Sequence, residues 1–119
     1  RRVYLEGLKN LLSATRAGHV IFVSSTSVYA QSDGSVVTEE SPAEPSMETG
    51  RILREAEQVT LEVGGTVLRL SGIYGPGRSV LLRKYLEGSA VLENGGDRWI
   101  NQIHRDDAAR AVVHAVTNE

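Results

Sequence analysis

Hydroxyl groups and glycines gather in two short segments of the sequence. The first is S-S-T-S-V-Y, residues 24–29, and the second is S-G-I-Y-G-P-G, residues 71–77. Serine, threonine and tyrosine hydroxyls can orient a substrate oxygen or exchange a proton with it, and glycine lets a ligand approach the backbone closely. The two segments therefore predict a ligand site lined by polar groups.

Each segment continues an apolar run that has the length of a strand. The runs are V-I-F-V-S, from Val20 to Ser24, and T-V-L-R-L-S, from Thr66 to Ser71, which continues through G-I-Y. Short, continuous apolar runs indicate strands buried on both faces, as in parallel sheets. Ligands of such sheets bind at the carboxyl ends of the strands, and both segments lie there.

One segment with helical periodicity precedes the first of these strands, and a second lies between the two strands. Residues 3–17 carry a stripe of leucines, and we expect Gly18 to end that helix. Residues 47–63 carry a second apolar stripe, ended by Gly64 and Gly65, and residues 31–46 between strand and helix are predicted to be a polar surface loop. The order helix, strand, helix, strand predicts an α/β fold with a doubly wound parallel sheet.

The last third of the chain has a mixed pattern. Residues 80–86 are predicted to be helical, and residues 90–92 and 99–103 are predicted to be short strands around the turn N-G-G-D. Asp106 or Asp107 is expected to cap a final helix. The predicted apolar face of that helix consists of Ala109, Val112, Val113 and Val116.

Composition narrows the classes of function. The chain has 119 residues, is 40% hydrophobic and carries a formal net charge of -2, which argues against a nucleic-acid surface. The absence of cysteine excludes disulfides, thiolate metal sites and a cysteine nucleophile, and the histidines show no metal-ligand spacing. No apolar run has membrane-spanning length, so we expect a cytoplasmic protein without a membrane or nucleic-acid partner.

Four segments, taken in order, resemble a known family. They are V-I-F-V-S-S-T-S-V-Y-A from residue 20, T-G-R-I-L-R-E-A-E from residue 49, L-R-L-S-G-I-Y-G-P-G-R from residue 68 and I-N-Q-I-H-R-D-D-A-A-R-A from residue 100. Together they resemble the extended short-chain dehydrogenase/reductase family, and more narrowly its NAD-dependent epimerase/dehydratase group. The resemblance covers essentially the whole chain.

The resemblance implies a division of the chain and a cofactor. Residues 1–78 would be the second half of an NAD(P)-binding Rossmann domain, residues 79–105 part of a substrate lobe, and residues 106–119 a helix that returns to the Rossmann domain. The glycine-rich turn that seats the pyrophosphate of NAD or NADP is expected upstream of Arg1. We therefore also expect residues 1–119 alone not to fold stably.

The family's catalytic residues are matched only in part. Its substrate-orienting serine falls on Ser25, but its tyrosine falls on Thr49 and its lysine on Leu53, while its asparagine falls on Tyr4. Threonine is far too weak an acid and too short to replace the tyrosine, and leucine carries no charge to stabilise a tyrosinate. The resemblance therefore implies an atypical active site that lacks the usual acid.

Other positions of the site follow from the two hydroxyl-rich segments. Tyr29 and Tyr74 are candidate replacement acids, although packing is the alternative role for both. The residues expected at the cofactor are Ser24, Ser25, Ser71, Gly72 and Ile73. Those expected at the substrate are Thr26, Arg78 and Trp99, while for His104 an architectural role is favoured and Arg69, in a buried strand, must be paired.

The resemblance leads to two hypotheses of function. The first is an atypical NAD(P)-dependent epimerase/dehydratase-like oxidoreductase that acts on a hydroxyl or carbonyl substrate, a nucleotide sugar being the commonest choice by analogy of fold. The alternative is a non-catalytic NAD(P)-binding sensor or regulatory protein. In the family, helices equivalent to residues 3–17 and 47–63 pack against their copies in a partner subunit, which makes a homodimer an expectation here too.

Overall fold

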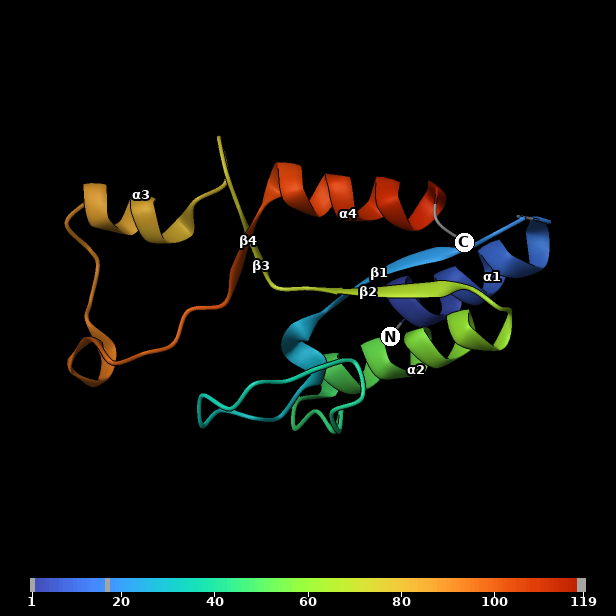
Figure 1. Ribbon diagram of the computed structural model, residues 1–119, viewed down its shortest axis with the longest axis horizontal. Helices are drawn as coiled ribbons and strands as arrows, with labels where there is room; N and C mark the ends of the chain where they lie inside the picture. The colour runs from blue at the N-terminus through green and yellow to red at the C-terminus, as the bar shows by residue number, and fades with distance from the viewer. Residues whose placement is uncertain (1, 17, 118–119) are drawn as a thin grey trace.

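The structure is a computed structural model that describes residues 2–16 and 18–117. Figure 1 shows a two-stranded sheet with helices on both of its faces, and a second small sheet that leads to a separate arm. The helices are α1 (Gly7–Ala14), preceded by a π-helical turn at Arg2–Glu6, α2 (Glu48–Glu62), α3 (Val80–Leu86) and α4 (Arg105–Thr117). The strands are β1 (Ile21–Ser25), β2 (Thr66–Leu70), β3 (Gly72–Tyr74) and β4 (Gln102–His104).

Strands β1 and β2 pair in parallel, as predicted. Ile21 lies beside Thr66 and Ser25 lies beside Leu70, so the two strands end together. Because the strands run in the same direction, the residues that follow them emerge at one edge of the sheet. The two hydroxyl-rich segments are therefore neighbours in space, although 40 and more residues separate them in sequence.

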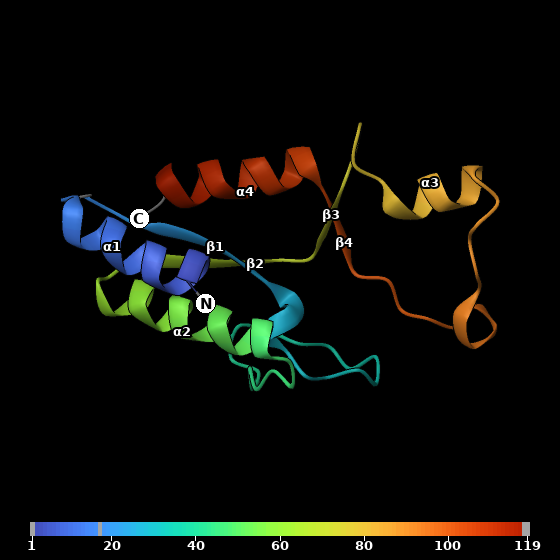
Figure 2. The same ribbon diagram turned by 180° about the vertical axis from the view of Figure 1, so that it is seen from behind.

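Helices α1 and α2 cover one face of this sheet, and α4 covers the other (Figures 1 and 2). The core under α1 and α2 is formed by Leu5, Ile52 and Ala56, with Leu8, Phe22 and Val59 packed around them. Burial of a side chain of this size contributes roughly 1.5–3 kcal/mol, so this layer is the main source of stability around the strand ends. Helices on both faces are what a doubly wound fold requires.

The two helices before and after β1 end differently. Helix α2 ends where Gly64 adopts a positive φ of 75°, and Gly65 N–H then donates to the Thr60 carbonyl, as predicted for this glycine pair. The prediction for Gly18 is wrong. Helix α1 ends at Ala14, where the backbone becomes extended at Thr15 and the Thr15 hydroxyl bonds the Leu11 carbonyl instead.

The run that begins at Thr66 is two strands rather than one. Strand β2 stops at Leu70, and β3 starts at Gly72, where the Gly72 N–H donates to the Asn101 carbonyl. Strand β3 then pairs in parallel with β4, in a different sheet from β2. Ser71 is the point at which the chain passes from one sheet to the other.

Several predictions for the last third of the chain need correction. Residues 90–92 form no strand, and in the 99–103 region only Gln102–His104 is a strand, because these are the residues that find a partner in β3. Helix α4 begins at Arg105, so both aspartates lie in its first turn and the Nδ1 atom of His104 accepts the Asp106 N–H. The face of α4 that packs is formed by Ala108, Ala111, Val112 and Ala115, whereas Val113 and Val116 are exposed.

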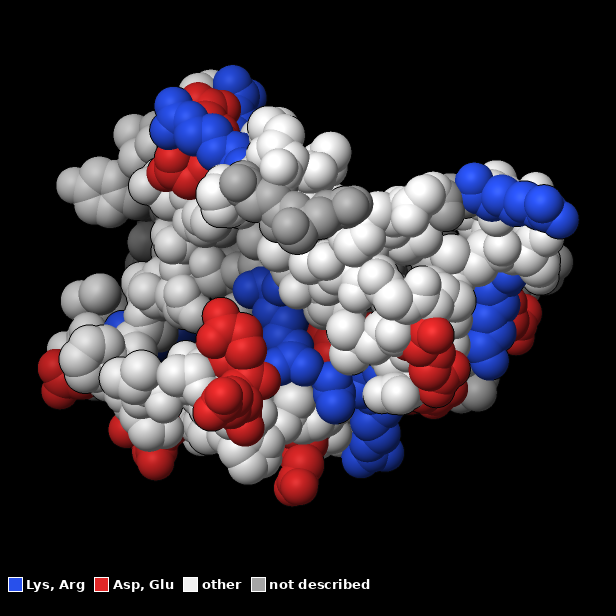
Figure 3. Space-filling model, turned by 45° about the vertical axis from the view of Figure 1, so that its right-hand side comes forward, with Lys and Arg blue, Asp and Glu red and all other residues white. Residues whose placement is uncertain are grey.

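Basic and acidic side chains lie side by side on the face shown in Figure 3. Among the described residues, no helix is both long enough and apolar enough to cross a bilayer. Residues 31–46 contain no helix or strand and form the predicted surface loop.

Candidate functional site

The two serines that end β1 point in opposite directions. Ser24 is 5% exposed, and its hydroxyl donates to the Glu57 carboxylate on α2 at 2.6 Å. Ser25 faces the other way, because neighbouring side chains alternate along a strand. Its hydroxyl accepts the Ser27 N–H at 3.1 Å and caps the short 3₁₀ turn Thr26–Val28, which leaves its own proton to donate to another group.

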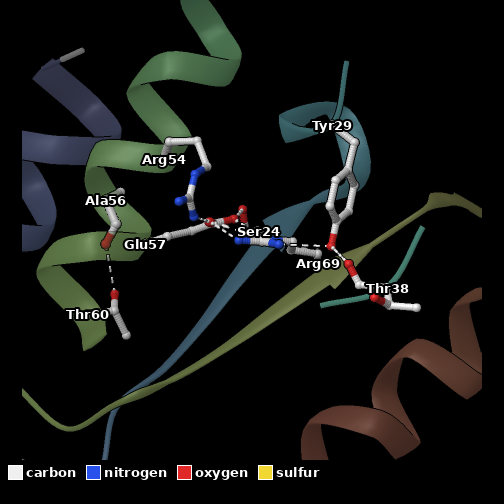
Figure 4. A network of polar contacts seen from close by, with 8 residues as sticks. All are labelled: Ser24, Tyr29, Thr38, Arg54, Ala56, Glu57, Thr60 and Arg69. Carbon is white, nitrogen blue, oxygen red and sulfur yellow. Dashed lines mark hydrogen bonds and ion pairs between the residues drawn. The ribbon is translucent and has the colours of Figure 1, made fainter. Parts of the chain in front are cut away.

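Glu57 is a fully buried carboxylate at the centre of a polar network (Figure 4). It accepts hydrogen bonds from Arg69 and pairs also with Arg54 on its own helix. Burial raises the pKa of the Glu57 carboxyl, but the hydrogen bonds it accepts, above all from Arg69, outweigh burial and hold the pKa below its usual range. The carboxylate is therefore charged at neutral pH.

Arg69 carries the matching charge on β2, as the need to pair a buried arginine predicted. Its Nη2 lies 2.9 Å from a Glu57 oxygen and its Nη1 donates to the Tyr29 hydroxyl at 2.8 Å. The hydrogen bonds to Glu57 raise the pKa of Arg69 above its ordinary value. The Tyr29 hydroxyl in turn donates to the Thr38 carbonyl at 2.9 Å, so the network extends to the surface loop.

Gly72 is an exposed glycine just past the carboxyl end of β2. Its φ is not in the positive range that favours glycine, and a Cβ built there would meet its nearest neighbour, the Asn101 carbonyl, at an ordinary 3.4 Å. By contrast, Gly50 is needed for packing, since a Cβ there would lie 2.5 Å from Pro45. Neither conformation nor internal packing requires a glycine at position 72, and its backbone is open to close approach by a ligand.

One cavity of about 700 Å³ brings together three of the predicted site residues. Thr26, Tyr29 and Trp99 line it, together with other residues of the 97–101 segment and with residues 31, 32 and 34–37 of the surface loop. Trp99 is 82% exposed, and its indole lies against Gly34, where an added Cβ would be 2.7 Å from Nε1. Trp99 and this loop therefore meet at the cavity, which Thr26, the residue after β1, also lines.

A second cavity, of about 850 Å³, contains two other predicted residues. Tyr74 and Arg78 line it together with Arg83 and His104. The Tyr74 ring meets His104 edge to face, with centroids 5.3 Å apart. The structure therefore divides the predicted substrate and acid residues between two cavities, with Thr26 and Trp99 in one and Arg78 and Tyr74 in the other.

Comparison with known proteins identifies the family. The model of the NAD dependent epimerase/dehydratase family matches residues 2–119. The chain belongs to that family. It is 34% identical over 116 residues to Protein YeeZ of Escherichia coli, in both strain K12 and strain O157:H7. The solved structure of a protein from Methylobacillus flagellatus assigned as a NAD-dependent epimerase/dehydratase superposes with a TM-score of 0.76 at 36% identity.

These matches cover nearly all of this chain but less than half of each relative. The aligned part is 92% of this chain and 40% of YeeZ, and 93% of this chain and 41% of the Methylobacillus protein. Membership of an NAD-dependent family implies a nicotinamide cofactor. Of the positions predicted for it, Gly72 offers exposed backbone, whereas the Ser24 hydroxyl is already bound to Glu57.

Thr49 and Leu53, the two positions that the resemblance predicts for the family's catalytic tyrosine and lysine, lie on α2. Thr49 is exposed in the first turn of the helix, and Leu53 is half-buried one turn later. Both belong to the same helical face, as positions four residues apart do. The Thr49 hydroxyl is a very weak acid and Leu53 carries no charge, so neither side chain offers proton-transfer chemistry at this face of α2.

Sequence reasoning missed Glu57 as the centre of the polar network. A signal was present, because Arg69 in a buried strand required an anionic partner. The choice among the acidic residues of R-E-A-E depended on the rotation of α2, which places Glu57 inward and Glu55 half-buried. Among the described residues, no group of three metal-ligating side chains comes together.

Proposed function

We propose that the protein is an atypical NAD(P)-dependent epimerase/dehydratase-like oxidoreductase acting on a hydroxyl or carbonyl substrate. A nucleotide sugar is the commonest substrate by analogy of fold. The observation that carries the proposal is Gly72, a glycine that nothing inside the chain requires, at the strand edge where Ser25 presents its hydroxyl.

Four residues at this edge would hold the nicotinamide end of the cofactor: Ser25, Ser71, Gly72 and Ile73. The bound cofactor would accept or return a hydride. Gly72 would allow the ring to lie close to the backbone, and Ser71, half-buried between the two sheets, would add a hydrogen bond. NAD and NADP are both compatible with this part of the chain.

Ser25 would orient the substrate oxygen through the proton that its capping bond leaves to donate. Thr26 and Trp99 would contact the substrate from the cavity beside it, and Arg78 would contact an anionic part of it from the neighbouring cavity. Of the two candidate acids, Tyr74 is favoured over Tyr29. The Tyr74 side chain is 40% exposed, whereas the Tyr29 hydroxyl already donates its proton to the Thr38 carbonyl.

Turnover with a panel of nucleotide sugars tests this function. The absorbance of reduced nicotinamide is followed with NAD⁺, NADH, NADP⁺ and NADPH, and product is analysed in parallel because an epimerase returns its hydride. The expected result is turnover of at least one substrate, with kcat lowered about 10²-fold or more by Ser25→Ala, as for loss of a positioned catalytic group. Turnover that Ser25→Ala leaves unchanged would contradict the proposed site.

A non-catalytic sensor of the same fold is the second candidate. It is favoured by one observation: neither Thr49 nor Leu53 replaces the chemistry of the family's tyrosine and lysine. Such a protein would bind a nicotinamide cofactor at the same strand edge and turn nothing over. Cofactor binding together with no product from any substrate of the panel would favour the sensor.

We also propose a homodimer through the helices of residues 3–17 and 47–63, in the cytoplasm. Its support is the apolar surface these helices expose, with Val3 80%, Tyr4 58%, Leu11 58% and Leu61 50% accessible. A C₂ pair would bury these side chains against their own copies. Sedimentation of the intact protein as a monomer at micromolar concentration would contradict the dimer.

A further inference from the structure

The Tyr29 hydroxyl makes two hydrogen bonds. It donates to the Thr38 carbonyl at 2.9 Å and accepts from Arg69 Nη1 at 2.8 Å. The Arg69 guanidinium also lies over the Tyr29 ring, 5.0 Å from its centroid. The phenol therefore joins the surface loop to strand β2, and Figure 4 shows it between the two.

Arg69, the hydrogen-bond partner of Tyr29 on the sheet, is held in place by Glu57. Arg69 bonds the Glu57 carboxylate through Nε at 3.1 Å and through Nη2 at 2.9 Å. Glu57 is fully buried and also accepts from Ser24 on β1. Because a bidentate arginine–carboxylate pair fixes orientation as well as distance, Arg69 presents Nη1 to Tyr29 from a site defined by α2, β1 and β2.

The loop on the other side of Tyr29 has few restraints of its own. In the described structure, the other hydrogen bonds of residues 31–41 stay within residues 31–42, such as Thr38 N–H to Ser41 and Gln31 to the Pro42 carbonyl. The bond from Tyr29 to Thr38 is therefore the polar contact that ties this stretch to the sheet.

This tied stretch is one wall of the cavity near the end of β1. Residues 31, 32 and 34–37 line the cavity with Thr26, and Gly34 lies against the indole of Trp99, which also lines it. A displacement of the loop would separate Gly34 from Trp99 and open the cavity. The width of the cavity thus depends on where the Tyr29 hydroxyl holds Thr38.

We propose that Tyr29 is a positioning residue whose hydroxyl, held by Arg69 and Glu57, fixes the 31–41 loop as the wall of the substrate cavity facing Trp99. The assignment of that cavity to a substrate rests on the proposed function. The anchoring of the loop does not, because it follows from contacts within this chain.

Tyr29→Phe tests the anchor by removing one oxygen atom while keeping the ring. The substitution removes both hydrogen bonds of the hydroxyl, and loss of the one to Thr38 should raise deuterium uptake at the amides of residues 31–41 by about 2- to 10-fold. Uptake in α2 should stay unchanged. Tyr74→Phe is the matched control, since among the described residues the Tyr74 hydroxyl has no hydrogen-bond partner, and it should leave uptake in the loop unchanged.

The fluorescence emission of Trp99 is a second measurement. It should not change if Tyr29 affects only its own immediate surroundings. Tyr29→Phe should shift the emission of Trp99, isolated as the difference between each protein and its Trp99→Phe counterpart, because Gly34 leaves the indole. The Kd for NAD⁺ should change by less than about twofold, since Tyr29 is not among the residues placed at the cofactor.

Unchanged uptake in residues 31–41 would overturn the proposal, as would an unchanged Trp99 emission. Faster exchange throughout α2 and the loop together would overturn it too, because the hydroxyl would then support the whole fold. Failure of wild-type protein to bind any nicotinamide cofactor would contradict the proposed function instead. The comparison of loop exchange would still decide whether Tyr29 anchors the loop.

Discussion

The layer around Glu57 and the arm from α3 to Trp99 use their side chains in opposite ways. In the first, Val28, Ala56, Glu57 and Thr60 are completely buried. In the second, Tyr85 is 73% exposed, Leu92 83% and Trp99 82%. In the first region, the polar side chains bond to one another and hold α2, β1 and β2 together. The second region exposes apolar side chains.

Residue type alone does not decide whether a hydroxyl group bonds within the fold or is left to contact a ligand. Ser24 and Ser25 are neighbours at the end of the same strand, yet one bonds a buried carboxylate and the other caps a turn at the sheet edge. Tyr29 and Tyr74 divide in the same way. In each pair, the residue beside Glu57 or Arg69 is the one whose hydroxyl proton is already donated within the chain.

Glu57→Gln should produce the largest change of all. Removing the charge leaves Arg69 without its anionic partner in a partly buried site, and the loss of one partner of a buried pair costs about 3–5 kcal/mol of unfolding free energy. Urea denaturation measures it. Glu62→Gln, an exposed carboxylate at the end of the same helix, is the control and should change stability by about 0.5 kcal/mol or less.

The same pair of proteins should show a pH dependence of known sign. The folded-state pKa of Glu57 is held below its usual range, so its ionisation stabilises the protein above the pKa of the unfolded chain. That stabilisation is lost as pH falls through the folded-state pKa. The gap in unfolding free energy between wild type and Glu57→Gln should therefore narrow toward acidic pH, and a gap that widens would contradict the charged network.

Gly50→Ala should have an intermediate effect. The new Cβ would lie 2.5 Å from Pro45 Cβ and 3.1 Å from the Ser27 carbonyl. Overpacking of this kind costs about 1–3 kcal/mol, which exceeds the roughly 1 kcal/mol that alanine gains over glycine within a helix. Thermal unfolding should show a net loss, while Gly18→Ala, with nothing within 4 Å of its Cβ, should show none.

Trp99→Ala should have the smallest effect on stability despite the size of the side chain. Because the residue is 82% exposed, the free energy of unfolding should change by about 0.5 kcal/mol or less. A loss of several kcal/mol in the same urea assay would mean that the exposed arm is packed like the layer around Glu57.

The sequence predicted most of the fold, because strands β1 and β2 and helices α2 and α3 have strong local patterns. It failed where tertiary contacts decide. The break at Ser71 depends on β4 pairing with Gly72, and the packed face of α4 depends on which side meets the sheet. In the site, the location of Ser25 and Gly72 followed from strand order. The engagement of Ser24 and Tyr29 depended on Glu57, whose inward direction no local pattern revealed.

The most direct test of the account is calorimetric titration of NAD⁺ and NADP⁺, oxidised and reduced, into the wild-type protein and Gly72→Val. We expect micromolar binding of at least one form to wild type, and at least about tenfold weaker binding to Gly72→Val, in which a side chain occupies the space left for the nicotinamide ring. Gly18→Val, at a position that precedes the amino end of β1 and has open space around it, should bind like wild type. Absence of binding to wild type, or equal binding to Gly72→Val, would contradict a cofactor at this edge.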